Sequence, residues 1–366
     1  MSRKTTRREF LRVPEVKDAK KTPRGEKALD KTSEASLSES PTLIMHVSRR
    51  AMASEFEVRF PVGCHEKDAE LALETMELLE SVEEQISFYR PSSEISRINL
   101  LAAEGPIAVE PELFRLFCLA RDIWQQTDGA LDITSTALWQ AWGFARRTGT
   151  VASEEQIAHA LSRVGFQYVQ LDAEHSTIRF TRQGLQLNLG SMGKGYALDQ
   201  CTAKLLQGGM EHFLLHAGQS SILAHGSDSG LITTSQDTTP AFWTIGIPHP
   251  RRANQRIGEI KLRNRAIGTS SSQFQSFQQQ GKRFGHIIDP RTGRPAEGVI
   301  SATVVAPTAV LADALSTAFF VLGLEKTQAY CREHTEIGAI LLTPSTRGKD
   351  YEIHIVGLND CDFLIL

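Results

Sequence analysis

Short strand-like segments alternate irregularly with helical segments along this chain, and that order most constrains its fold. Polar and apolar residues alternate over residues 54–60, as in a strand with one buried face. From Asp68 to Ile86 apolar residues recur every three or four positions, which predicts a long amphipathic helix. Further strand-like segments are residues 168–171, 177–180, 213–216, 243–247, 257–262, 301–305, 337–342 and 351–356, and further helical segments are residues 196–206, 309–322 and 325–332. Because several strands follow one another as hairpin-like pairs, we predict an α+β fold with mixed or antiparallel sheets flanked by helices.

Two helices have boundaries that can be read from single residues. Pro111 is expected to open one of them, because the missing N–H of proline costs nothing in the first turn. Ser153 is a good N-cap for another helix, which we expect to continue as far as Gly165.

The charge distribution divides the chain into two parts. Residues 1–31 hold 11 Lys and Arg against 5 Asp and Glu, whereas the remaining residues hold 29 basic and 38 acidic side chains. We therefore predict a basic, disordered arm over residues 1–45 and a single domain over residues 46–366, with no linker rich in Pro or Ser to divide it. The formal net charge of −3 gives no reason to expect nucleic acid as a partner.

The N-terminus contains a degenerate twin-arginine-like motif at residues 6–12, but the residues after it are too charged to form the apolar segment that an export signal needs. Since no run of about 18 apolar residues is present either, we expect no transmembrane segment. We expect a cytoplasmic protein, with export through this N-terminus as the alternative. The five cysteines form no CxxC pair and are interpreted as free thiols.

Residues 284–295 contain the densest group of chemically active side chains. The Asp-Pro and Thr-Gly pairs in this segment are typical of a turn, which would hold His286 and Asp289 on a constrained loop. With Arg291 and Arg294 nearby, such a loop can bind anionic oxygens. An ordinary surface turn with paired charges is the alternative interpretation.

A carboxylate and a hydroxyl lie four residues apart at Asp313 and Thr317, so both face the same side of the predicted helix. Oxygen ligands of this kind suit a hard cation such as Mg²⁺. The alternative is that Asp313 binds backbone N–H groups near the helix start while Thr317 bonds back into its own helix.

Residues 187–199 are expected to form a strand, a glycine-rich turn and the start of a helix. Exposed N–H groups at such a helix start attract phosphate, and Lys194 adds a positive charge. The segment is not a Walker A loop, because Gly195 follows the lysine where Ser or Thr is required. A purely structural glycine turn is the alternative.

Two earlier segments, residues 86–99 and 129–134, combine polar side chains with nearby aromatic residues. Phe88 and Tyr89 belong to the first, and Trp139 and Trp142 follow the second. These aromatic rings are able to stack on a flat ligand, although packing in the core explains them equally well.

Taken together and in this order, these five segments resemble the ApbE family of FAD:protein FMN transferases, over about residues 50–345. The resemblance implies a two-lobed, T-fold-related α+β domain that binds FAD and a divalent cation, usually Mg²⁺. It also implies transfer of FMN from FAD to a Ser or Thr hydroxyl of an acceptor flavoprotein, with a phosphoester formed and AMP released. The acceptor motif in that family has the form Asp-x-Ser/Thr-Ala/Gly-Ser/Thr.

The resemblance assigns roles to individual residues of this sequence. His286 and Asp289 are the implied catalytic residues, with His286 beside the scissile phosphate. The implied metal ligands are a backbone carbonyl near Gly193 and the side chains of Asp313 and Thr317. The implied contacts to FAD are Met52, Tyr89, Ala130, Leu131, Asp132, Asn188, Lys194, His286 and Arg291.

The sequence departs from the usual family pattern at three places. Asn188 stands where the family usually has Asp, and Ser191 stands where it usually has Gly. Gln219 and Ser220 replace a Gly-Asp pair, and Ser271 replaces a glycine. Two alternatives to the transferase therefore stay open: a non-catalytic protein that binds or delivers FAD, and an FAD pyrophosphatase that yields FMN and AMP. We find no acceptor motif in the chain and do not expect it to flavinylate itself.

Overall fold

The computed structural model describes residues 43–64, 66–145, 148–228, 241–250, 252, 254–272, 276–345, 350–359 and 362–366. Nearly all of the predicted basic arm, with its twin-arginine-like motif, lies outside these residues. No helix of the described chain is long and apolar enough to cross a membrane. The four cysteines that the structure describes, Cys64, Cys118, Cys201 and Cys331, are free, as expected.

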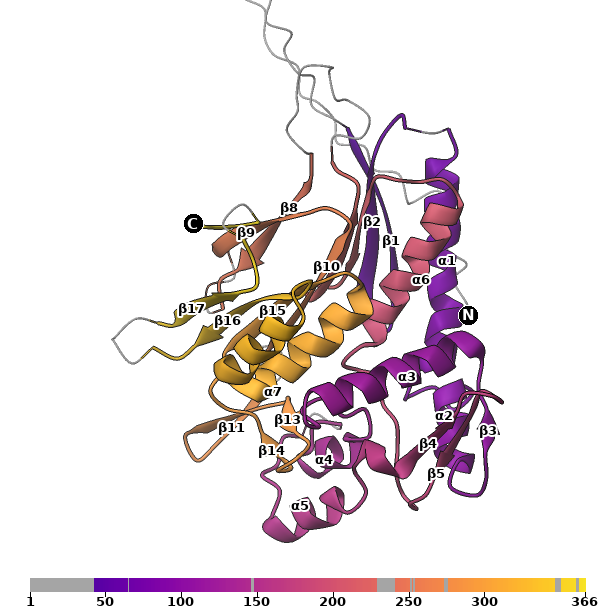
Figure 1. The fold of residues 1–366 in the computed structure, drawn as a ribbon, viewed down its shortest axis with the longest axis vertical. Coiled ribbons are helices and arrows are strands. Elements are labelled where there is room, and N and C mark those ends of the chain that lie inside the picture. The colour runs from indigo at the N-terminus through magenta and orange to yellow at the C-terminus, as the bar shows by residue number, and fades with distance from the viewer. Residues whose placement is uncertain are drawn as a thin grey trace, which may run out of the picture. The chain divides into compact units, whose positions relative to one another are not determined.

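An antiparallel sheet of eight strands forms the centre of the described chain (Figure 1). Its order is β1-β2-β6-β7-β10-β15-β16-β17, and every neighbouring pair is antiparallel. The bounds are β1 Ile44–Ala51, β2 Ser54–Pro61, β6 Phe213–Ala217, β7 Ser221–His225, β10 Arg265–Ser271, β15 Ser301–Ala306, β16 Gly338–Thr343 and β17 Glu352–Val356. The α+β class and the predominance of antiparallel sheets are thus confirmed.

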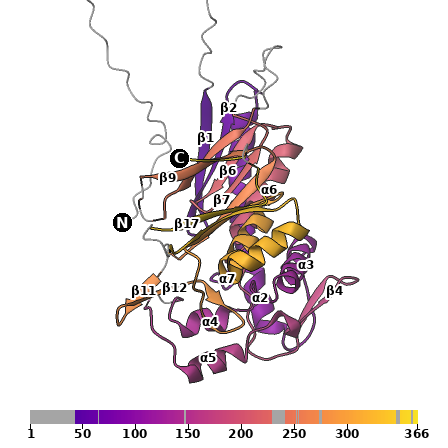
Figure 2. The same ribbon diagram turned by 60° about the vertical axis from the view of Figure 1, so that its left-hand side comes forward.

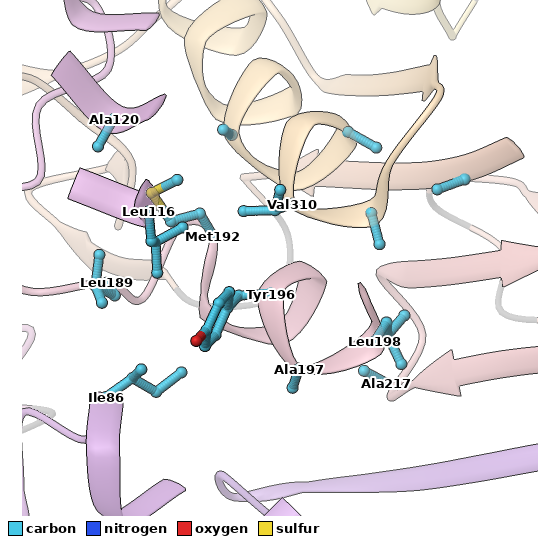
Figure 3. Close-up of a cluster of buried hydrophobic side chains, with 14 of the residues drawn as sticks. Ile86, Leu116, Ala120, Leu189, Met192, Tyr196, Ala197, Leu198, Ala217 and Val310 are labelled. Carbon is cyan, nitrogen blue, oxygen red and sulfur yellow. The ribbon is translucent and has the colours of Figure 1, made fainter. Parts of the chain in front are cut away.

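Three helices, α1 (Asp68–Ile86), α6 (Gly193–Gln207) and α7 (Ala309–Glu333), cover one face of this sheet (Figures 1 and 2). The period-two pattern explains why, since Phe56, Val58 and Phe60 of β2 are buried on that face. Figure 3 shows part of the resulting core, with Tyr196 of α6 lying among apolar side chains from several elements.

The opposite face of the central sheet packs against a smaller antiparallel sheet in the order β18-β9-β8. Its strands are β8 Trp243–Pro248, β9 Arg256–Leu262 and β18 Phe363–Ile365. The second apolar core lies between the two sheets and includes Ile245, Ile260, Ile267 and Ile340. Residues of β10, β15 and β16 therefore alternate between two different cores, which requires both of their faces to be apolar.

A second group of elements lies below and beside α7 in Figure 1. It contains α2 Glu94–Leu101, α3 Pro111–Gln126, α4 Thr136–Ala141, α5 Glu154–Leu161 and the 3₁₀ turn Phe166–Tyr168. A small sheet, β3 Ile107–Ala108, β5 Thr177–Phe180 and β4 Val169–Asp172, belongs to the same group. So do two hairpins, β11 Ser276–Gln279 with β12 Lys282–Gly285, and β13 Ile288–Asp289 with β14 Arg294–Pro295.

The predicted starts of α1, α3 and α5 agree with the structure, but the end of α5 differs from the prediction. Ser153 caps α5 in a capping box with Gln156, yet the helix ends at Leu161 rather than at Gly165. Gly165 has a φ of 137° and begins the 3₁₀ turn instead. The two helical patterns of residues 309–322 and 325–332 agree with the two parts of α7, which are separated by non-helical backbone at Gly323, where φ is 77°.

Candidate active site

A cavity of about 560 Å³ lies among the segments that the sequence singled out. Its wall is formed by the glycine-rich turn before α6, the turn between β6 and β7, the end of β10, the loop before β13, and the first turns of α4 and α7. Seven of the predicted site residues line it: Tyr89, Asp132, Asn188, Lys194, His286, Asp313 and Thr317. Folding thus brings side chains from positions 89 to 317 of the sequence into one place.

The other predicted site residues are not among those that line the cavity. Ala130 and Leu131 are buried in the protein, and Gly193 is buried at the start of α6. Met52 lies in the turn between β1 and β2, with a φ of 49°, two residues before Ser54, which does line the cavity. Contact of these residues with a ligand stays a prediction.

Asp289 and Arg291 form an ion pair with each other instead of facing the cavity. The Arg291 Nε and Nη2 atoms donate to the two carboxylate oxygens of Asp289, each at 2.8 Å. This bidentate pair raises the pKa of Arg291. Arg291 lines a neighbouring hollow of about 500 Å³, which shares only Asp132 with the first cavity among their described lining residues. Its charge is therefore already compensated by a carboxylate.

The loop that carries His286 is anchored at both of its ends. The Trp142 Nε1 atom donates to the Gly293 carbonyl at 2.8 Å, and the Ala296 N–H donates to the Ile287 carbonyl at 2.9 Å. Gly293 has a φ of 71°, and a Cβ there would lie 2.7 Å from Ile157, so only glycine fits. The imidazole of His286 packs edge-on against Phe144, with 6.5 Å between the ring centroids. These contacts hold His286 in the cavity wall.

Asp313 is a buried carboxylate at the end of the first turn of α7, with 6% of its surface exposed. Its Oδ2 atom accepts a hydrogen bond of 2.7 Å from the Gly195 N–H at the start of α6. Burial raises the pKa of Asp313 to about 6, while Lys194 and the hydrogen bond from the Ser221 hydroxyl act in the opposite direction.

Hydroxyl groups surround Asp313 and Lys194. The Lys194 ammonium donates to the Ser220 hydroxyl, which takes the place of the carboxylate usual in the resembled family. Ser270 Oγ lies 2.9 Å from Ser316 Oγ and 3.1 Å from Thr317 Oγ1, and the Ser316 hydroxyl donates to the Asp313 carbonyl at 2.8 Å. These hydroxyls are hydrogen-bond partners that orient one another around the carboxylate.

Asn188 and Asp132 shape the backbone of the cavity wall. The Asn188 Oδ1 atom accepts from the Gly190 N–H at 2.9 Å, which closes the glycine-rich turn. Asp132 accepts from the Thr134 N–H at 2.8 Å, from the Thr134 hydroxyl at 2.6 Å and from the Phe166 N–H at 3.1 Å. Burial raises the pKa of Asp132 despite these bonds. Asn188 thus supplies the acceptor that an aspartate would supply in the same turn, without its charge.

Sequence reasoning did not single out several residues of the cavity wall. Ser135 and Thr136 come from the start of α4, and Ser316 lies between Asp313 and Thr317 on α7. The Thr136 Oγ1 atom is buried and has no hydrogen-bond partner among the described residues. Hydroxyl side chains are too frequent in any sequence to mark a site, and only the spacing of Asp313, Ser316 and Thr317 on one helix offered a signal.

The oxygen atoms that line the cavity are of the type that binds a hard divalent cation. Among the described residues, no three His, Cys, Asp or Glu side chains come together as a complete metal centre. The Asp313 carboxylate and the hydroxyls of Ser316 and Thr317 nevertheless match the preference of Mg²⁺, which is commonly held by one or two carboxylates together with substrate phosphates. A cation here would complete its ligand set with oxygens of a bound phosphate compound.

Comparison with known proteins agrees with this geometry. The sequence pattern of the ApbE family matches residues 52–341. Proteins named FAD:protein FMN transferase from Treponema pallidum and Vibrio cholerae are each 30% identical to this chain, over 75% and 86% of its length and 77% and 92% of theirs. The chain belongs to the ApbE family.

Solved structures give the same result for the fold. The ApbE protein of Thermotoga maritima is 26% identical and superposes with a TM-score of 0.75, covering 86% of this chain and 97% of its own. The flavin transferase ApbE of Vibrio cholerae is 27% identical, with a TM-score of 0.74, over 86% of this chain and 98% of its own.

Proposed function

We propose that this protein is an FAD:protein FMN transferase, which moves FMN from FAD to a Ser or Thr hydroxyl of an acceptor flavoprotein and releases AMP. The observation that carries the proposal is the convergence of Lys194, His286, Asp313 and Thr317 on one cavity from three distant segments. The names of the curated relatives support the same activity.

The cavity suits the pyrophosphate of FAD. Its volume of about 560 Å³ lies within the usual range for small-molecule sites. Lys194 is in the first turn of α6, where the helix dipole favours negative charge. Lys194 therefore binds and orients a phosphate group of FAD, while Asn188 and Gly190 keep the turn open enough for the ligand to approach.

Asp313, Thr317 and the backbone carbonyl of Gly193 would hold a Mg²⁺ ion. When bound, the ion supplies positive charge that neutralises the phosphate oxygens and the leaving AMP. The protein's own contribution is to keep Asp313 ionised and oriented, through Lys194, Ser221 and the Gly195 N–H. Mg²⁺ dependence is part of the proposal.

His286 is the proposed general base. Histidine is the side chain whose ordinary titration range lies near neutrality, which suits proton transfer from an acceptor hydroxyl. A ring nitrogen of His286 accepts the proton of the acceptor Ser or Thr as its oxygen forms a bond to the FMN phosphorus. The bond from that phosphorus to the oxygen of AMP breaks at the same time, so the product is a phosphoester of FMN. Asp289, paired with Arg291, holds the loop rather than the proton.

The test is to incubate the protein with FAD, Mg²⁺ and an acceptor protein that carries the Asp-x-Ser/Thr-Ala/Gly-Ser/Thr motif. Flavin fluorescence that stays with the acceptor on a denaturing gel, together with one AMP released per label, is the expected result. AMP and free FMN without labelling would instead support a pyrophosphatase. Bound FAD without either product would support the flavin-delivery alternative and exclude both reactions.

A further inference from the structure

The helices α6 and α7 cap each other through two carboxylates. Asp199 of α6 accepts hydrogen bonds from the Ala309 N–H at 2.8 Å and from the Val310 N–H at 2.9 Å, at the start of α7. Asp313 of α7 accepts in turn from the Gly195 N–H, at the start of α6. We call this arrangement, formed by Asp199 and Asp313, the reciprocal cap. Each helix thus provides a carboxylate that accepts hydrogen bonds from N–H groups in the first turn of the other helix, where such groups have no partner within their own helix.

The two helix starts also approach each other at the backbone. A Cβ on Gly195 would lie 2.2 Å from the Ala309 carbonyl oxygen, and a Cβ on Gly268 of β10 would lie 2.3 Å from the Ala312 carbonyl oxygen. No side chain separates α7 from α6 or from β10 at these points. A small shift of α7 is therefore transmitted directly to the cavity wall.

Residues on both sides of the reciprocal cap belong to the proposed pyrophosphate site. Lys194 immediately precedes Gly195 on α6, while Asp313 and Thr317 follow Ala309 by one and two turns on α7. Asp199 itself is not among the described residues that line the cavity. Its carboxylate nevertheless joins the element that carries the lysine to the element that carries the proposed metal ligands.

We propose that Asp199 is a positioning residue of the transferase, which keeps Asp313 and Thr317 in register with Lys194 so that one FAD pyrophosphate and its cation contact both helices. The inference rests on the proposed function. Two backbone N–H groups point at Asp199, so a carboxylate, with two acceptor oxygens, suits the place better than an amide, which has one. An ionised side chain at a helix N-terminus also interacts favourably with the helix dipole.

A local helix cap is the competing explanation, and α7 offers a matched control for it. Thr308 is the N-cap of the same helix, and its side chain accepts from the Leu311 N–H at 3.4 Å. Thr308 is exposed and contacts α7 alone through this bond, whereas Asp199 reaches α7 from α6. Thr308→Ala removes a cap without touching the link between the helices.

The experiment compares Asp199→Ala, Asp199→Asn and Thr308→Ala with the parent, using the quenching of FAD fluorescence during a Mg²⁺ titration and thermal unfolding without ligand. We expect Asp199→Ala to raise the Mg²⁺ concentration for half-maximal FAD binding at least about tenfold, because the proposed metal ligands on α7 would no longer be held in register, and loss of groups that orient metal ligands commonly costs that much. Asp199→Asn is expected to have a smaller effect in the same direction. Thr308→Ala is expected to lower the unfolding temperature but to leave the Mg²⁺ midpoint within about twofold of the parent.

Three outcomes would overturn the inference. Equal shifts of the midpoint in Asp199→Ala and Thr308→Ala would reduce Asp199 to a helix cap, and so would an unchanged midpoint in a folded Asp199→Asn. If Asp199→Ala does not fold, Asp199→Asn decides alone. A parent protein that fails to bind FAD at any Mg²⁺ concentration would overturn both the proposed function and this inference. If the parent binds FAD and transfers FMN normally, the first two outcomes overturn the role of Asp199 alone, and the proposed function stands.

Discussion

Ten serine and threonine residues line the cavity among its described wall residues, whereas Lys194 is the only lysine or arginine there. Neutral hydroxyls orient a ligand but add no charge to the wall. Each charged group therefore has a large share in binding an anionic dinucleotide. Spacing and turn chemistry pointed to Lys194, His286, Asp313 and Thr317, because such signals act within a few residues. The contacts of the Ser270 hydroxyl with Ser316 and Thr317 became visible only when β10 was placed beside α7.

Lys194→Met is expected to weaken FAD binding by about 10- to 100-fold, since a hydrogen bond to a charged group contributes about 1.5–3 kcal/mol. The parent's affinity should also fall more steeply with salt than that of the variant. Fluorescence titrations at low and high ionic strength measure both effects. Lys204 lies at the other end of α6 and forms an ion pair with Glu74. The variant Lys204→Met is therefore the control and should bind FAD as tightly as the parent does. Equal affinity of Lys194→Met and the parent would show that Lys194 does not contact the phosphates.

His286→Ala is expected to lower the rate of FMN transfer by about 10²- to 10⁴-fold, the usual contribution of a general base. FAD binding should change by less than about threefold, because the loop is anchored by Trp142 and Ala296 rather than by the imidazole. Single-turnover labelling of an acceptor measures the rate. The exposed His175 provides the control variant, His175→Ala. Undiminished labelling by His286→Ala would assign the proton transfer to another group.

At the scale of elements, the periodic patterns predicted most of the helices and most strands of the central sheet. The predicted helix from Asp68 to Ile86 has the bounds of α1, and residues 177–180 have the bounds of β5. In the central sheet, the strands β1, β7 and β10 were not predicted. The sequence of β10 contains Gly268, which is not typical of a strand interior, but this glycine is what lets α7 approach. The tertiary contact thus overrides the local propensity.

Gly195→Ala is expected to destabilise the fold by about 1–3 kcal/mol, because its Cβ would collide with the Ala309 carbonyl and push α7 away from α6. Urea unfolding measures the change in the free energy of unfolding. Gly105→Ala is the matched control, since a Cβ there meets nothing within 4 Å and its φ is not positive. If Gly195→Ala is as stable as Gly105→Ala, α7 can move away from α6 without lowering the free energy of unfolding.

At the scale of the whole molecule, the site lowers the stability of the fold that contains it. Burial raises the pKa of Asp313 from its ordinary 3.8 to about 6, and that of Asp199 likewise to about 6. Between pH 3.8 and about pH 6, both carboxyl groups hold a proton in the folded chain but have lost it in the unfolded chain. The contribution of these two groups to stability is therefore present at low pH, falls as the pH rises through this interval, and stays low above about pH 6.

Asp313→Asn imitates the protonated acid and is expected to be more stable than the parent at pH 8, by about 1–3 kcal/mol. At pH 4 the two proteins should be nearly equal, because Asp313 of the folded parent is then protonated too. Thermal unfolding of both proteins without FAD, across this pH range, measures the difference. A parent that is the more stable of the two at pH 8 would mean that the ionised carboxylate is fully compensated by its neighbours.

The reciprocal cap also has a consequence for the order in which the protein is made. Its two halves lie more than a hundred residues apart, so on the ribosome α6 emerges long before α7 exists. Until then the backbone N–H of Gly195 has no carboxylate partner, and Lys194 has no Asp313 beside it. A nascent chain that ends before residue 309 therefore lacks Asp313 and Thr317, and the proposed pyrophosphate site is completed only when the last part of the chain is synthesised.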